Sequence, residues 1–292
     1  MIKQEVINLI RNDATYHEIL SELDLYDYEL LHLYYQWLFL RRKKLPEDIA
    51  ERMRQDYLQY FSFINLKRDK IMLIADSHLG SKYENLLYLE QAKEIAKKRK
   101  INTIFHGGDI GDGLVEHNPI HKNYQEQIEY ILAKYSFFED MDQYIMGGNH
   151  DRRYKESGLD ILKLISELYE NVTPIGYYQS YFKVFEKIIS FEHNSKIRKK
   201  NKLINPDFII AAHSHKGVFK NGEVKLPTAS DINPNCEPIN SEPGFEILIT
   251  SKDKTGVNLN FERYETTENG PEKTKVKTYH LSNNKKRHRQ IS

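Results

Sequence analysis

The stretch YIMGGNHDRRY, residues 144–154, joins an apolar run to an unusual set of polar side chains. Tyr144 to Met146 has the character of a buried strand, and two glycines follow it directly. A plain turn would need the glycines and one short polar residue. It would not need an imidazole between an amide and a carboxylate, followed by two arginines. The stretch therefore predicts a functional site at the end of a strand.

Four further polar clusters follow apolar runs in the same part of the chain. They are DSH at 76–78 after the run 71–75, GGDIGD at 107–112 after 103–106, His193 after 188–191, and HSH at 213–215 after 208–212. Strand ends that face one edge of an α/β sheet bring their loops together, and that edge is where ligands bind. We therefore expect the five clusters to meet at one edge of a sheet.

The residue types in these clusters favour a metal site. Asp-x-His and His-x-His place two side chains on one side of an extended segment, because side-chain direction alternates along a strand. The clusters offer carboxylate, imidazole and amide groups without a thiolate, which suits Mn, Fe or Zn rather than a structural zinc site. Any one cluster alone is also explained as a turn or an incidental pair. Together, with His106, they hold six of the twelve histidines in the chain, which such explanations do not account for.

The region around the clusters alternates strands and helices. Helices are expected at 83–100, 124–138 and 160–169, between the apolar strand runs. Beyond about residue 171 the pattern predicts strands at 180–185, 188–191, 208–211, 245–250, 257–263 and 276–280. This order is typical of a layered α/β domain.

Three segments are expected along the chain. Residues 1–68 have the periodicity of a small helical module, with a pattern typical of a helix-turn-helix. Residues 69–281 are expected to form the main domain, and residues 282–292 a basic tail. Acidic residues outnumber cations up to Glu29, the wrong sign for DNA binding, although the cluster Arg41–Lys44 keeps that interpretation open. The alternative is a module that packs on the main domain, on a second copy in a homodimer, or on a partner protein.

Composition sets further limits. Net charge is +1, so an argument for nucleic acid must rest on local patches. Cys236 is the only cysteine, and the first residues lack the apolar core of a signal peptide. The longest apolar stretch, Leu30 to Leu40, is too short to span a membrane. A cytoplasmic protein with no membrane partner is expected.

Taken in order, DSH, GGDIGD, GGNHD, a lone His after a strand and HSH resemble the signature of the calcineurin-like metallophosphoesterases, over about residues 70–250. The resemblance implies a four-layer α/β/β/α sandwich with two divalent metal ions at the strand ends, manganese first and iron or zinc as alternatives. By motif position, one ion would be held by Asp76, His78 and His215, the other by Asn149, His193 and His213, with Asp109 bridging them. The fourth motif departs from the family, because Glu192 stands where glycine often precedes the His.

The resemblance also implies a mechanism. His150 would be the catalytic histidine, and Asp112 matches the family position that orients it. A hydroxide bridging the two metals would attack phosphorus, and His150 would protonate the leaving oxygen as general acid. His106 is expected to support the site rather than to bind metal.

The substrate is less specified than the reaction. Protein Ser/Thr phosphatases of the superfamily carry arginines after the second-motif Asp and before GNHE, whereas glycines such as Gly113 occupy these places here. HGGD and GNHD are more similar to repair exonucleases and their phage and bacterial relatives, so a nuclease acting on DNA or RNA is predicted. Arg152 and Arg153 are the expected substrate contacts, and the basic run 196–202 is either part of a phosphate track or a solvated loop. The alternatives are a nucleotide or small-molecule phosphatase or phosphodiesterase with the same metals, and a non-catalytic binding subunit.

Overall fold

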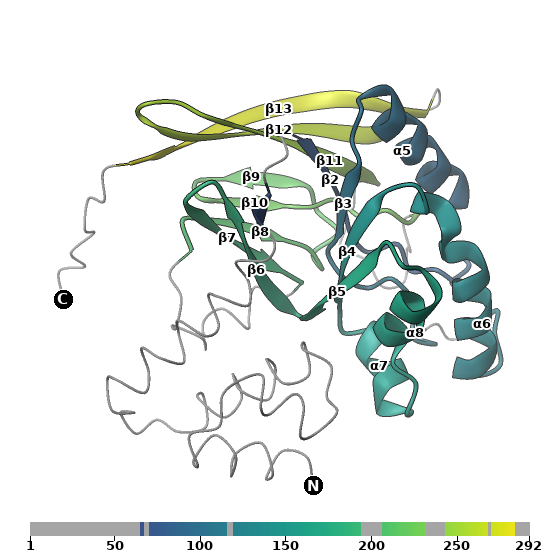
Figure 1. The fold of residues 1–292 in the computed structure, drawn as a ribbon. Coiled ribbons are helices and arrows are strands. Elements are labelled where there is room, and N and C mark those ends of the chain that lie inside the picture. Colours follow the sequence, from purple (N-terminus) through teal and green to yellow (C-terminus); the bar gives the residue numbers. More distant parts are fainter. Residues whose placement is uncertain are drawn as a thin grey trace, which may run out of the picture.

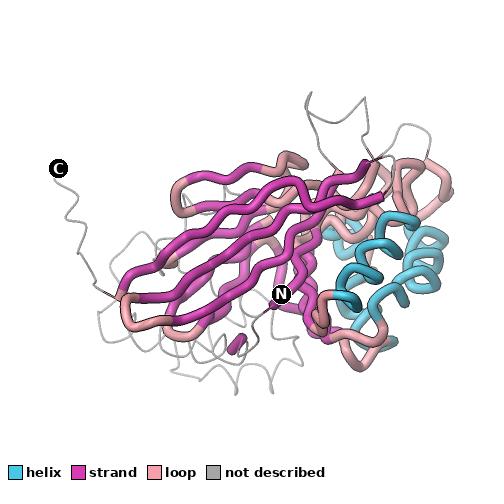
Figure 2. The backbone as a smooth tube through the Cα atoms, turned by 90° about the horizontal axis from the view of Figure 1, so that it is seen from above, coloured by secondary structure: helices cyan, strands magenta, loops and turns pink. Residues whose placement is uncertain are grey.

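The computed structural model describes residues 65–66, 70–115, 119–193, 206–231, 243–267 and 270–283. Within these residues two β-sheets face each other, and the helices cover the outer face of one of them (Figure 1). Figure 2 shows the helices gathered on one side of the strands. The resemblance implied four layers, and the described residues contain three of them: one layer of helices and two sheets.

The larger sheet has seven strands and carries most of the sequence motifs. Its order is β13 (Gly270–Ser282), β12 (Gly256–Thr267), β11 (Gly244–Lys252), β2 (Lys70–Ile74), β3 (Thr103–His106), β4 (Asp142–Gly147) and β5 (Val172–Tyr177). Strands β2 to β5 are parallel, and β11 joins β2 antiparallel. The parallel strands are mostly apolar because both of their faces are covered.

The second sheet has six strands. Its order is β1 (Asn65–Leu66), β6 (Gln179–Val184), β7 (Lys187–Glu192), β8 (Phe208–Ala211), β10 (Glu223–Lys225) and β9 (Val218–Lys220). Strands β7 and β8 run parallel, so their ends point to the same edge.

The helices are crossover connections between the parallel strands. They are α5 (Leu86–Lys98), α6 (Tyr124–Lys134) followed by the 3-10 turn η1 (Tyr135–Phe138), α7 (Asp151–Glu156) and α8 (Ile161–Leu168). The side chains of Asn85, Asn123 and Asp160 accept backbone N–H bonds and thereby start α5, α6 and α8. Right-handed crossovers place such helices on one face of the sheet.

Two apolar cores hold the layers together. One lies between the helices and the larger sheet, where Ala92 and Ala96 let α5 approach closely. The other lies between the two sheets and is rich in aromatic rings, with Phe105 in contact with Phe182 and Phe191. The inter-sheet core brings the ends of β7 and β8 beside the ends of β2, β3 and β4.

The predicted elements after residue 70 are confirmed with shifted ends, and four elements were not predicted. These are β5, the two strands β9 and β10 of one hairpin, and the short helix α7. Asn65 and Leu66, at the end of the segment expected as a helical module, form β1 and pair with β6. The rest of that module, and the basic tail beyond residue 283, lie outside the described residues. No helix among the described residues is long and apolar enough to cross a membrane.

Candidate metal centre

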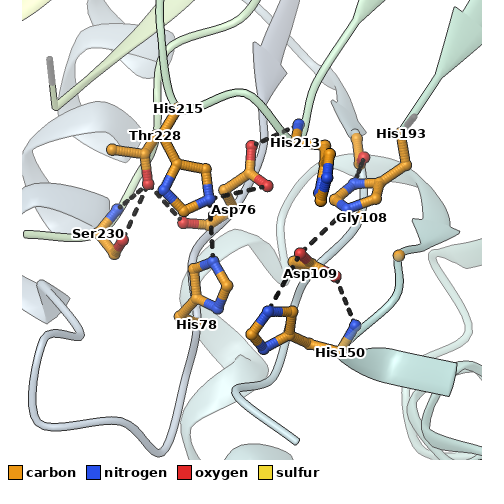
Figure 3. A network of polar contacts seen from close by, with 12 residues as sticks. Asp76, His78, Gly108, Asp109, His150, His193, His213, His215, Thr228 and Ser230 are labelled. Carbon is orange, nitrogen blue, oxygen red and sulfur yellow. Dashed lines mark hydrogen bonds and ion pairs between the residues drawn. The ribbon is translucent and has the colours of Figure 1, made fainter. Parts of the chain in front are cut away.

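The five polar clusters meet at one edge, where the ends of both sheets come together (Figure 3). The larger sheet contributes the loops after β2, β3 and β4, and the smaller sheet contributes those after β7 and β8. In chain order these loops present Asp76 and His78, Asp109, Asn149 and His150, His193, and His213 and His215.

One group of potential ligands consists of Asp76, His78 and His215, whose ligand atoms all lie within 4.8 Å of one another. His215 Nε2 is 3.5 Å from Asp76 Oδ1 and 3.3 Å from His78 Nε2. The carboxylate is fully buried, and the loop of His213 returns to it through a backbone N–H bond of 3.2 Å to Asp76 Oδ2. This is the first ligand set that the resemblance implied, apart from the bridging Asp109.

A second group consists of Asp109, His193 and His213. His193 Nε2 is 3.0 Å from Asp109 Oδ2 and 3.1 Å from Asn149 Oδ1. The other ring nitrogen of His193 donates to the carbonyl oxygen of Gly107 at 2.7 Å, which directs Nε2 toward the carboxylate. Asp109 also groups with His78 and His150, so it lies between the two sets of ligands.

The donor atoms fit a pair of divalent cations. Asp76 Oδ1 and Asp109 Oδ2 are buried and accept no hydrogen bond, which is costly for a carboxylate. Each faces an imidazole nitrogen, and two acceptors at such distances repel unless a proton or a metal cation lies between them. Carboxylate, imidazole and amide donors without thiolate suit manganese, iron or zinc.

Burial and mutual charge shape the protonation of the cluster. Burial lowers the pKa of His78 to about 3, with the positive charge of His150 acting in the same direction. Burial opposes protonation of His193 as well, but the carboxylate of Asp109 overrides it and raises the pKa of His193 to about 9. The Asp109 carboxylate therefore stabilises positive charge at His193.

The backbone delivers the ligands by a route that differs from the expected one. Asp76 and His78 have φ values of 55° and 44°, and His213 and His215 have values of 71° and 51°. These left-handed residues lie in loops after the strands end, so the paired ligands do not alternate along an extended segment as predicted. Asp and His tolerate this region better than most residues, and such conformations concentrate at functional sites.

Two glycines make room for the ligands. A Cβ at Gly148 would lie 2.6 Å from His193 Nε2, and one at Gly108 would lie 2.5 Å from His193 Nδ1. Gly108 also has a φ of 97°. The glycines of GGD and GGNHD thus allow two loops to approach the imidazole ring of His193 closely.

His150 extends between the two ligand groups. Its ring packs edge-on against that of His78, with centroids 4.6 Å apart, and its Nε2 is 3.9 Å from Asp109 Oδ2. Nδ1 donates to the backbone carbonyl of Asp112 at 2.6 Å. The Asp112 carboxylate accepts the N–H of Val115, and its role in orienting this ring, which the resemblance implied, stays a prediction.

Residues 69–204 match the sequence model of the calcineurin-like phosphoesterase family. This region, which contains four of the five clusters, belongs to the calcineurin-like phosphoesterases. The match identifies the family and leaves its branch open. No curated protein matches this chain significantly.

The chain is similar to several solved structures at low sequence identity. Vps29 of Chaetomium thermophilum is 15% identical, with 74% of this chain and 99% of that chain covered and a TM-score of 0.44. A dimetal phosphatase from Danio rerio is 11% identical over 73% and 99%, with a TM-score of 0.42. GAP50 of Plasmodium is 13% identical over 74% and 90%, with a TM-score of 0.41. These likenesses are too distant to carry a conclusion about activity.

Arg152 and Arg153 are exposed residues in the first turn of α7. Arg152 Nε is 2.9 Å from Glu156 Oε1, and the guanidinium also bonds the side chain of Tyr178. The side chain of Arg153 packs beside Gly113. Both arginines are thus close to His150 in sequence, and their role as substrate contacts stays a prediction. The basic run 196–202 lies outside the described residues.

Several supporting residues carried no assigned role in the sequence analysis. Asp151 is fully buried and accepts three backbone N–H bonds, from Ile110, Gly111 and Gly148, which ties the second and third motif loops together. Burial raises the pKa of Asp151 to about 6. Its place in GGNHD was the only signal for this role.

The hydroxyl of Thr228 donates to the backbone oxygen of Asp76 at 2.9 Å, and no sequence pattern indicated this contact. His106 accepts the N–H of Gly108 and bonds Ser77, so it supports the site as expected. Glu192 bonds Ser190 within its own strand, and His193 takes its place in the centre despite this departure from the family.

Proposed function

We propose that this phosphoesterase uses two divalent metal ions to hydrolyse phosphodiester bonds in DNA or RNA. The observation that carries the proposal is the pair of ligand groups on either side of Asp109, whose buried Oδ2 accepts no hydrogen bond. Asp76, His78 and His215 would hold one ion, Asn149, His193 and His213 the other, and Asp109 both.

When bound, two such ions would supply Lewis acidity toward a phosphoryl oxygen and lower the pKa of a coordinated water. Manganese is the first choice, with iron and zinc as alternatives. Asn149 is a neutral ligand, which limits the negative charge that an anionic substrate meets.

His150 would act as the general acid. The carbonyl of Asp112 holds the proton on Nδ1, so the ring offers Nε2 to the space between the ligand groups. A protonated ring can give this second proton to the leaving oxygen of the ester. His78, in edge-on contact with His150, limits the directions in which the acid can turn.

Two glycine positions that have no room for a larger side chain favour a phosphodiester substrate over a phosphoprotein. The protein Ser/Thr phosphatases of the superfamily carry arginines where this chain has Gly113 and Gly147. A Cβ at Gly113 would lie 2.6 Å from the backbone oxygen of His150, and one at Gly147 would lie 3.0 Å from Cγ of the Tyr177 ring. Neither position can hold an arginine that clamps a doubly charged monoester. Arg152 and Arg153, outside the centre, suit the singly charged phosphates that flank a scissile bond in a nucleic acid.

The test is a substrate panel with manganese. Single-stranded DNA, duplex DNA, RNA, bis-p-nitrophenyl phosphate and p-nitrophenyl phosphate are compared for the wild type, for His150→Ala and for His280→Ala. His280 is an exposed histidine of β13 bonded to Asn258, so it serves as the matched control. Loss of a general acid is expected to slow cleavage about 10²- to 10⁴-fold. Hydrolysis of the monoester alone would replace the nuclease by a small-molecule phosphatase.

A further inference from the structure

A buried ion pair lies in the core between the two sheets. Arg263 on β12 and Glu246 on β11 are register partners, and their side chains are 1% and 0% exposed. Arg263 Nε donates to Glu246 Oε1 at 3.0 Å, and Nη2 bonds the same oxygen. A buried pair of this kind rarely stabilises a fold more than well-packed apolar residues of equal volume. Its presence among aromatic rings calls for a reason other than stability.

The other side of the guanidinium contacts the hairpin of the second sheet. Nη2 donates to the backbone oxygen of Lys225 on β10 at 3.3 Å, and the guanidinium carbon is 4.3 Å from the centre of the Phe219 ring on β9. It also lies against Gly217 so closely that a Cβ there would be 2.5 Å from Cζ of Arg263. Arg263 therefore links the larger sheet to the segment that enters β9.

That segment is the loop that carries two of the proposed metal ligands. Gly217 comes two residues after His215, and both His213 and His215 have left-handed backbone. A non-glycine residue in such a conformation costs about 1–3 kcal/mol and persists only where the surroundings hold it. At its first end the loop is held by the N–H of Ala212, which donates to the oxygen of Glu192 at 2.7 Å. At its C-terminal end, Gly217 packs against the guanidinium of Arg263.

We propose that Arg263 is a positioning residue, which, held by Glu246, fixes the backbone at Gly217 and thereby directs His213 and His215 into the metal centre. The inference rests on the metal ligands of the proposed function and not on the substrate. A guanidinium suits this role because its flat face packs against Gly217 and Phe219 while its edge bonds a carboxylate and a carbonyl. A lysine has neither the flat face nor the fork of donors.

Two variants address the contact, and a third is the matched control. Gly217→Ala keeps the ion pair but forces its guanidinium and the loop apart, while Arg263→Lys keeps the charge but loses the planar group. Arg99→Met removes an ion pair on the opposite face of the same strand, where Arg99 Nη2 is 2.7 Å from Glu262 Oε2 and Nη1 bonds Tyr264. Thermal unfolding of each full-length variant confirms that it is folded before comparison.

The first readout is manganese binding by calorimetry. Because His213 and His215 belong to different ligand groups, we expect Gly217→Ala and Arg263→Lys to weaken both ions about 10- to 100-fold, as loss of supporting contacts does at other metal sites. Arg99→Met should stay within about twofold of the wild type, since it leaves the loop untouched.

The second readout is amide exchange in the peptide spanning residues 212–218, measured without metal. Faster exchange is expected in Gly217→Ala and Arg263→Lys and not in Arg99→Met. Exchange and manganese affinity equal to the wild type in both test variants would overturn the proposal. Exchange alone decides the outcome if the wild type binds no manganese, and absence of nuclease activity changes neither readout.

Discussion

Replacing Gly148 with alanine tests the architecture of the metal centre most directly. The added Cβ would lie 2.6 Å from both the backbone nitrogen of Asp109 and the Nε2 of His193, and closer still to Asp109 Oδ1. Ordinary contact begins near 3.4 Å, so these neighbours must move by about 0.8 Å. Asp109 and His193 are 1% and 0% exposed and have no open space into which to move.

A shift of this size exceeds what metal coordination tolerates. Ligand distances at a metal site hold to within about 0.2 Å, and a misplacement near 1 Å costs about 10²-fold in rate. We expect Gly148→Ala to weaken manganese binding at least about tenfold and to lower kcat on bis-p-nitrophenyl phosphate by about 10²-fold. Overpacking should also lower the free energy of unfolding by about 1–3 kcal/mol.

Gly222→Ala is the control, because Gly222 has a φ of 74° and no atom within 4 Å of an added Cβ. It should lose about 1–2 kcal/mol through backbone strain alone while manganese binding and kcat stay unchanged. The measurements are titration calorimetry, steady-state kinetics and urea unfolding. Two manganese ions bound by Gly148→Ala with wild-type affinity and rate would refute the reasoning.

Three further predictions concern single groups and the metal ions. Asp112→Asn should leave kcat within about threefold and the pH–rate profile unmoved, since the backbone oxygen of Asp112, which the substitution keeps, bonds His150 Nδ1; a hundredfold loss would mean that the carboxylate itself serves catalysis. Burial lowers the pKa of His106 to about 4, so as pH falls below the unfolded value of about 6.5 the unfolded chain takes up a proton that the folded chain refuses. The free energy of unfolding of the metal-free protein should therefore fall by about 2 kcal/mol between pH 7 and pH 5. In His106→Gln the free energy of unfolding, measured with urea at each pH, should depend less steeply on pH. An equally steep dependence would mean that His106 is protonated when folded. Removing metal with a chelator should lower the free energy of unfolding by about 2.7 kcal/mol for each ion present at a hundred times its dissociation constant, and an unchanged melting temperature would argue against bound ions.

The sequence located the candidate centre because strand ends are easy to recognise and their loops converge by topology. The polar clusters at Asp76, Asp109 and His193 each followed an apolar run, and the structure brings all of them to one edge. The physical route was misjudged at His78 and His215, because left-handed backbone in a loop depends on contacts from other segments that no local pattern encodes.

The supporting contacts were harder to foresee for the same reason. Asp151 and Thr228 act on backbone groups far away in sequence, so their side-chain type alone said nothing about their partners. The sequence pattern around Arg263 does indicate its burial. Because side chains alternate along a strand, Arg263 shares the buried face of β12 with Leu259 and Phe261. Glu246 shares a buried face with Leu248 in the same way. Two opposite charges on core faces of adjacent strands predict a buried pair.

The division of the centre between two sheets also bears on how the protein folds. Asp76, Asp109 and Asn149 follow strands of one sheet, whereas His193 and His215 follow strands of the other. His78 and His215, which meet in one ligand group, are 137 positions apart in the chain. The ions would find a complete set of ligands only after the sheets have docked, so binding comes after the slow, non-local part of folding.

Interactions absent from the folding transition state slow unfolding and leave the folding rate almost unchanged. Metal bound at this edge would therefore act mainly on the lifetime of the folded chain. Once docked, the two sheets would be held by coordination bonds at this edge in addition to the apolar contacts of the inter-sheet core.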